Sequence, residues 1–268
     1  MIDVEELKKI GKLKGIANIG HIEKDYLSDL ILLSISRHTK EELIFKGGTC
    51  LFKFYKLDRF SEDLDFTLKK ELDITRLLNR IVSDLKVFGI ECEIKKMKQT
   101  HNAIMITLRI KGPFYTGDDK TIATMRIDIN TKSTIELKPL VQRYISLYPD
   151  IPIFSIIIMQ EKEILSEKIR AILTRTKARD IYDLWFLLKK GVEFDPNLVK
   201  KKLKYYNMQW NKNLFLKNLN IKSEIWKAEL KPLVRTLPEF SEVKKLIREK
   251  IKISESENLP KNLRKREK

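Results

Sequence analysis

The chain has 268 residues, of which 43% are apolar and 34% are charged, and its formal net charge is +17. Its length and apolar content suffice for one large core or two modest ones, and the mixture of charge signs excludes a disordered polyelectrolyte. No apolar run of about eighteen residues is present, which excludes a membrane-spanning helix. Because the N-terminal MIDVEELKKIGK also lacks an apolar signal segment, we expect a cytoplasmic protein.

The first part of the chain predicts alternating helices and strands. The helical periodicity of IEKDYLSDLILLSISRHT precedes ELIF, which has the pattern of a short buried strand. A glycine turn, the helix TCLFKFYKL and the strand DLDFTL follow. The next helix, DITRLLNRIVSDLKVFG, has Asp73 near its start and Gly89 just past its end.

Three alternating segments, IECEIKKM, NAIMITLRI and TIATMRIDIN, predict neighbouring antiparallel strands, and IFSIIIM predicts a last strand. From Glu161 onward the periodicity is helical, through EKEILSEKIRAILTRT, DIYDLWFLLKKG and FSEVKKLIREKI. We therefore expect an α+β module with a mixed or antiparallel sheet over residues 1–155. A helical module over residues 156–251 and a basic, disordered tail over residues 252–268 would follow.

The positive charge is concentrated in part of the helical module. Residues 189–231 contain eleven lysines and four acidic residues, interleaved with Tyr205, Tyr206, Trp210 and Trp226. Such a surface attracts polyanions, and its aromatic rings could stack on unpaired bases. An AT-rich or heat-adapted genome would produce the same excess of lysine, with the aromatic residues in the core.

Paired carboxylates occur in the strand DLDFTL. Because side chains alternate along a strand, Asp63 and Asp65 share one face, about 7 Å apart, while Leu64 and Phe66 enter the core. In the later strand RIDIN, Asp128 would supply a third carboxylate if the two strands are neighbours. Carboxylates held together in this way favour a hard divalent cation such as Mg²⁺ or Mn²⁺.

The glycine turn supplies a second chemical element. Gly47 and Gly48 precede a helix start, where exposed backbone N–H groups and the helix dipole favour phosphate, and Thr49 adds a hydroxyl. A phosphate turn followed by metal-binding carboxylates favours nucleotidyl transfer from a nucleoside triphosphate (NTP).

These motifs resemble a known family. FKGGTCLFKFYKLDRFSEDLDFTL and the later EKEILSEKIRAILTRTKARDIYDLWFLL are similar to two blocks of the AbiEii/AbiGii toxin family, within the DNA polymerase β-like nucleotidyltransferases. The resemblance implies a catalytic module followed by a helical module that completes the nucleotide cleft. It also implies a toxin of a toxin–antitoxin or abortive-infection system that transfers NMP to RNA, with the tRNA 3′ end as the favoured acceptor and a cognate antitoxin as partner.

The resemblance also implies residue roles. The phosphates and the rest of the nucleotide would be bound by Lys46, Gly47, Gly48, Thr49, Arg59, Ser61 and Asp183. The catalytic residues would be Asp63, Asp65, Lys168 and Asp180. The metal would be bound by Asp63 and Asp65, with Asp128 added from strand alternation and the superfamily pattern.

Simpler interpretations stay open for several of these residues. Periodicity alone makes Lys168 a lysine on a solvated helix face, and Asp180 could stabilise a helix N-terminus or pair with Arg175 or Arg179. Three other functions also remain: modification of a protein with AMP, glycosyl transfer from a nucleotide sugar, and RNA binding without catalysis.

Overall fold

The structure is a computed structural model and describes residues 2–252. Two compact units divide the chain, the first ending at Gln160 and the second beginning at Glu161. The sequence-based boundary near residue 155 lies inside the last strand of the first unit, Phe154–Ile158. Apart from Lys252, the predicted tail lies outside the described residues. No described helix combines the length and apolarity needed to cross a bilayer.

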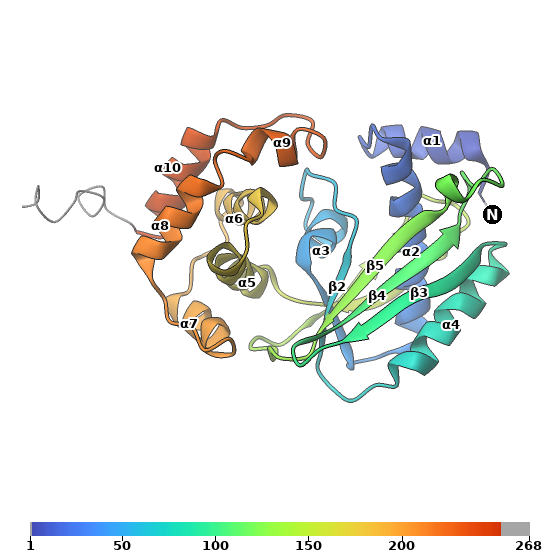
Figure 1. Cartoon of the computed structure of the whole chain (residues 1–268), viewed down its shortest axis with the longest axis horizontal. Coiled ribbons are helices and arrows are strands. Elements are labelled where there is room, and N and C mark those ends of the chain that lie inside the picture. The colour runs from blue at the N-terminus through green and yellow to red at the C-terminus, as the bar shows by residue number, and fades with distance from the viewer. Residues whose placement is uncertain (1, 253–268) are drawn as a thin grey trace, which may run out of the picture. The chain divides into compact units, whose positions relative to one another are not determined.

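The first unit is a sheet with helices (Figure 1). Its helices in chain order are α1 (Val4–Leu13), α2 (Ile19–His38), α3 (Gly47–Phe54), α4 (Ile74–Val87) and the 3-10 turn η1 (Asp119–Thr121). Its strands are β1 (Leu43–Lys46), β2 (Leu64–Leu68), β3 (Glu91–Gln99), β4 (Ala103–Lys111), β5 (Ala123–Asn130), β6 (Leu140–Tyr144) and β7 (Phe154–Ile158).

The strands form one sheet in the order β3-β4-β5-β2-β1-β7-β6. The β2–β5 and β1–β7 pairs are parallel and the other pairs are antiparallel. This mixed α+β arrangement confirms the predicted fold class, and β3, β4 and β5 are the predicted antiparallel neighbours. Strand β6 was not predicted, because four of its five residues are exposed and show no alternation.

Helix boundaries follow the local signals. The carboxylate of Asp73 accepts a hydrogen bond of 2.9 Å from the Arg76 N–H at the start of α4. Just past its end, Gly89 has a φ of 73°, which glycine adopts without strain. Both signals were readable in the sequence.

The helices of this unit cover one face of the sheet. Helix α2 packs on β5 and β7, and α4 packs on β3 and α2 (Figure 1). Helix α3 reaches the same side, because Phe54 packs against Phe45, whose strand partner Phe66 also points there. The apolar residues of β5 face these helices, whereas Asp128 and Arg126 alternate to the opposite face.

The second unit is helical. Its helices are α5 (Glu161–Thr174), α6 (Ala178–Lys189), α7 (Pro196–Lys204), α8 (Lys212–Ile221), α9 (Trp226–Leu230) and α10 (Phe240–Lys250). Helix α5 packs on α6, α7 and α8, and α6 also packs on α9 and α10.

Some of the lysines and aromatic residues that were predicted to lie on the surface of this unit are buried in its core. Trp226 is 1% exposed and packs on Tyr182 and Phe240. Lys202 is fully buried beside Glu163, with 2.6 Å between their charged atoms, and Lys222 donates to the Ile172 carbonyl. The expectation that Trp226 stacks on bases is therefore wrong, since a buried ring presents no face to a ligand.

Candidate active site

The glycine turn lies directly beside an acidic strand. Gly47 has a φ of +79°, and a Cβ at this position would collide with the carboxylate of Asp65. A Cβ on Gly48 would lie 2.6 Å from a guanidinium nitrogen of Arg59 and 2.7 Å from the hydroxyl of Ser61. Gly47 is therefore required both by close approach and by its backbone conformation, whereas a side chain at position 48 would force the ends of Arg59 and Ser61 to move.

Hydrogen bonds attach the turn to the start of β2. The hydroxyl of Thr49 is 2.6 Å from the Asp63 carbonyl and 3.0 Å from the Ser61 hydroxyl. Thr49 is fully buried and Arg59 is 2% exposed, with its guanidinium donating to the Phe60 carbonyl. These contacts place Thr49 and Arg59 inside the scaffold that holds Asp63.

Strand register brings the predicted carboxylates together. Asp65 in β2 lies opposite Lys46 in antiparallel β1 and opposite Asp128 in parallel β5. Neighbouring strands are about 4.8 Å apart, so Lys46, Asp65 and Asp128 form one row across three strands. We call the carboxylates of this row, together with Asp63 just before β2, the acidic row. Asp63 directly precedes β2, and Asp63, Asp65 and Asp128 are all partly exposed.

The second unit holds a separate charged cluster. The ammonium of Lys168 is 3.1 Å from Asp180 and 2.7 Å from Asp183, and Lys168 is only 7% exposed. Two nitrogens of Arg175 donate to the two oxygens of Asp180 at 2.7 and 2.8 Å. The interpretation of Lys168 as a solvated lysine is therefore wrong, and Arg175 is the partner of Asp180.

The charge state of Asp180 follows from these contacts. Burial raises the pKa of Asp180, but Lys168 and Arg175 lower it more strongly, and the result lies well below its usual range. The carboxylate is thus ionised throughout the physiological pH range. Asp180 lies in the first turn of α6, where the helix dipole also favours a negative charge.

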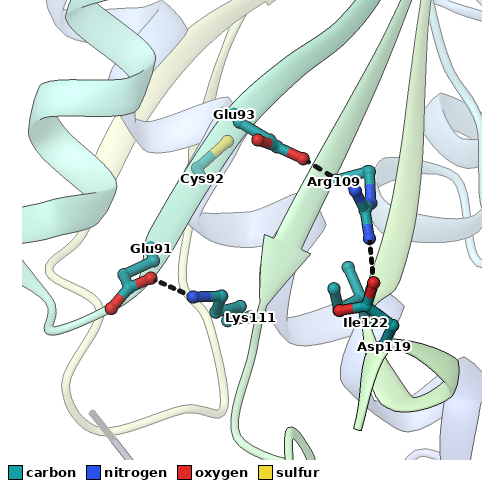
Figure 2. Close-up of a pocket in the computed structure, with 7 residues that line it drawn as sticks. All are labelled: Glu91, Cys92, Glu93, Arg109, Lys111, Asp119 and Ile122. Atoms are coloured by element: carbon teal, nitrogen blue, oxygen red, sulfur yellow. Dashed lines mark hydrogen bonds and ion pairs between the residues drawn. The ribbon is translucent and has the colours of Figure 1, made fainter. Parts of the chain in front are cut away.

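A hollow of about 250 Å³ lies at the other end of the β4–β5 ladder, away from Asp128. Figure 2 shows that its polar side chains already bond one another: Lys111 with Glu91 at 2.5 Å, and Arg109 with Glu93 at 3.1 Å and with Asp119 at 3.5 Å. Burial raises the pKa of the Cys92 thiol in this hollow to about 12, which keeps it unreactive. We therefore assign no chemistry to the hollow.

Residues 31–249 match the family described as nucleotidyl transferase AbiEii toxin of type IV toxin–antitoxin systems. The match begins in α2, ends in α10, and includes every residue of the glycine turn, the acidic row and the second cluster. The chain belongs to the AbiEii family. It is therefore a nucleotidyltransferase enzyme of a toxin–antitoxin system, which implies an NTP substrate and an antitoxin partner. Family membership removes the glycosyltransferase and non-catalytic alternatives.

Solved structures support the same fold. MenT4, a nucleotidyltransferase toxin from Mycobacterium tuberculosis, is 18% identical with a TM-score of 0.67, over 93% of this chain and 88% of MenT4. JHP933 from Helicobacter pylori is 24% identical with a TM-score of 0.56, over 85% of this chain and 88% of JHP933. A comparison with curated proteins finds no match.

The family implies a divalent metal, and the acidic row fits one only in part. Within residues 2–252, no three His, Cys, Asp or Glu side chains are grouped so that they could hold a metal ion by themselves. Asp65 and Asp128, however, are oxygen donors on adjacent positions of paired strands. Mg²⁺ is commonly bound by one or two carboxylates together with substrate phosphates and water, and this donor pair suits that mode.

Two clusters were not predicted as units. The bidentate Arg175–Asp180 pair was named only as one alternative, although the two residues lie five apart. A buried network around Asp25, Asp29 and Lys53 was missed. Its signal was two acidic residues four positions apart, Asp25 and Asp29, on the same face of a helix whose neighbouring residues are largely apolar.

Proposed function

We propose that this enzyme transfers NMP from an NTP to the 3′ end of an RNA, with tRNA as the favoured acceptor, in the cytoplasm where both substrates occur. The observation that carries the proposal is the register of β2 and β5. It places Asp65 and Asp128 side by side, next to the glycine turn.

Each residue of the first unit has a role in this proposal. The backbone N–H groups after Gly47 and Gly48 bind the triphosphate, and Lys46 lies at the same strand end to offset its charge. Asp63 and Asp65 would hold Mg²⁺ with the triphosphate, and Asp128 would complete the set. When bound, the ion would offset the charge of the leaving pyrophosphate and favour ionisation of the attacking hydroxyl. Ser61 and Arg59 keep the turn against β2.

The transfer step balances as a substitution at phosphorus. The 3′ hydroxyl oxygen of the acceptor bonds to the α-phosphorus, and the bond between the α-phosphorus and the oxygen bridging to the β-phosphate breaks. Pyrophosphate leaves, and the hydroxyl proton passes to Asp128, the carboxylate of the row that is nearest to the open strands β4 and β3.

In the second unit, we assign Lys168 to the phosphates and Asp180 and Asp183 to its positioning. Two carboxylates within 3.1 Å fix the direction of the lysine side chain. Arg175 keeps Asp180 ionised and in place, because a bidentate guanidinium pair is geometrically specific.

The test is transfer of label from each of four α-³²P NTPs, with Mg²⁺, onto total RNA and onto cell-extract protein. Asp63→Ala and Asp65→Asn should each lower label on RNA by roughly hundredfold or more. Asp119→Asn is the matched control, because this exposed acid lies in the same unit at the far end of the sheet and should leave transfer intact. Label on protein instead of RNA would refute the RNA acceptor, and equal transfer by wild type and Asp63→Ala would refute the assigned site.

A further inference from the structure

Strands β3, β4 and β5 present an open face beside the acidic row. In β4, Ile104, Ile106, Leu108 and Ile110 are buried on the helix side, and the alternate residues point to the opposite side. Asp128 lies on this opposite side and pairs with Met105, which is 38% exposed. In the part of the chain that the structure describes, the face that carries the proposed catalytic carboxylates therefore continues toward the edge strand β3 with exposed side chains.

Three cations lie on this open face near Asp128. Lys98 pairs with Met105 in the row of Asp128, and Lys96 pairs with Thr107 in the next row, whose β5 member is Arg126. From strand spacing and rise per residue, the Cα atom of Lys98 lies about 10 Å and that of Arg126 about 7 Å from the Cα atom of Asp128. All three cations are exposed. We call Lys96, Lys98 and Arg126 the cationic strip.

Ion pairing divides the same face into two ends. At the far end, Arg109 is neutralised by Glu93 and Asp119, and Lys111 is neutralised by Glu91 (Figure 2). The strip differs, since within residues 2–252 none of its three cations forms an ion pair. Among the strand cations described on this face, those that adjoin the acidic row therefore keep an uncompensated positive charge, whereas Arg109 and Lys111 do not.

We propose that the cationic strip binds the phosphate backbone of the acceptor RNA and directs its 3′ end to the acidic row. This inference rests on the proposed function and adds the path of the acceptor. The strip suits a polyanion, because its cations repel one another unless phosphates lie between them. Among the described residues, the strand partners of the strip on this face are Met105, which is apolar, and Thr107, which is polar. The surface therefore offers little to a protein partner, whose anchors would need apolar pockets.

The first experiment measures binding without NTP. Labelled bulk tRNA is titrated with wild type, with the triple variant Lys96→Ala/Lys98→Ala/Arg126→Ala, and with Lys111→Ala. The triple variant should bind roughly 10- to 100-fold more weakly at about 0.1 M salt, with a shallower dependence on salt. Lys111→Ala is the matched control, a lysine of the same hairpin that already pairs with Glu91, and should stay within about twofold of wild type.

The second experiment measures transfer. The triple variant should show a raised KM for RNA, while its KM for NTP and its kcat at saturating RNA stay near wild type. Unchanged RNA affinity in the triple variant would overturn the proposal, and so would an equal loss in Lys111→Ala or a loss of kcat alone. If wild type transfers no label but its RNA affinity depends on the strip, the proposed function fails and the RNA surface stands.

Discussion

At the scale of single residues, the candidate site depends on Gly47, which has no Cβ atom. Gly47 and Asp65 come from consecutive segments that approach until no Cβ fits between them. Gly117 offers a useful contrast, because it also has a positive φ, +93°, but a Cβ there would meet no atom within 4 Å. Substitution of Gly117 therefore introduces backbone strain alone, whereas substitution of Gly47 introduces backbone strain and a steric collision with Asp65.

Gly47→Ala should lower transfer by roughly hundredfold, because the new methyl group displaces the Asp65 carboxylate from its row. Gly117→Ala should cost about 1–2 kcal/mol of stability through its left-handed backbone alone and keep its activity. Label transfer and urea unfolding of both variants check this. Equal activities would show that the close approach of Gly47 to Asp65 has no catalytic meaning.

At the scale of elements, a buried charge network orients α3, the helix that begins at the glycine turn. The ammonium of Lys53 is 2.8 Å from Asp25 and 2.5 Å from Asp29, both on α2, and all three side chains are at most 1% exposed. Lys14 also bonds Asp25. Tyr144 donates to Asp29 at 2.9 Å from β6. The network therefore joins α2, α3 and β6 at the C-terminal end of α3, where Lys53 lies.

Lys53→Met should destabilise the protein by about 3–5 kcal/mol, because removal of one partner leaves buried carboxylates without their cation. Denaturant unfolding at neutral pH measures the change. Lys8→Met serves as control, since the Lys8–Glu5 pair lies on the surface and contributes little. A stability of Lys53→Met close to that of Lys8→Met would show that Lys14, Tyr144 and their neighbours hold the carboxylates without Lys53.

At the scale of the whole molecule, each unit has its own core and its own buried, ionised aspartate. Burial raises the pKa of Asp25, but Lys53 and Lys14 lower it by more than that, to about 2. The pKa of Asp180 is likewise held below its usual range. Not all of the +17 charge is available to a polyanion, because Lys202 and Lys222 are buried in the second unit. The exposed cations of the strip are therefore more informative than the total.

Stability should fall on acidification in both units. An unfolded aspartate has a pKa of about 3.9, so with lower folded values the unfolded state binds more protons as the pH drops. The stabilisation is complete above about pH 5 and is lost as the pH falls from about 4 toward 2. Circular dichroism follows the whole chain, and tryptophan fluorescence follows the second unit, which contains all three tryptophans. Unfolding free energies at pH 3 equal to those at pH 6 would contradict this prediction.

Local sequence patterns determined most elements of this protein. The period of a strand placed Leu64 and Phe66 in the core and Asp65 on the other face, although the strand begins at Leu64 and leaves Asp63 just outside it. Capping residues such as Asp73 marked a helix start, and the glycine pair indicated a tight turn. These properties depend on neighbours within a few residues of one another, so a single sequence is enough to predict them. The motifs they form were also enough to indicate the family.

Only the tertiary structure decided which distant residues meet. It placed β5 beside β2 in the register that pairs Asp128 with Asp65, and it buried Lys168 between two carboxylates. It also brought Arg126 into one strip with Lys96 and Lys98, across two strand pairings. Strand order and ion pairing depend on packing between segments far apart in the chain, and local periodicity carries no information about either.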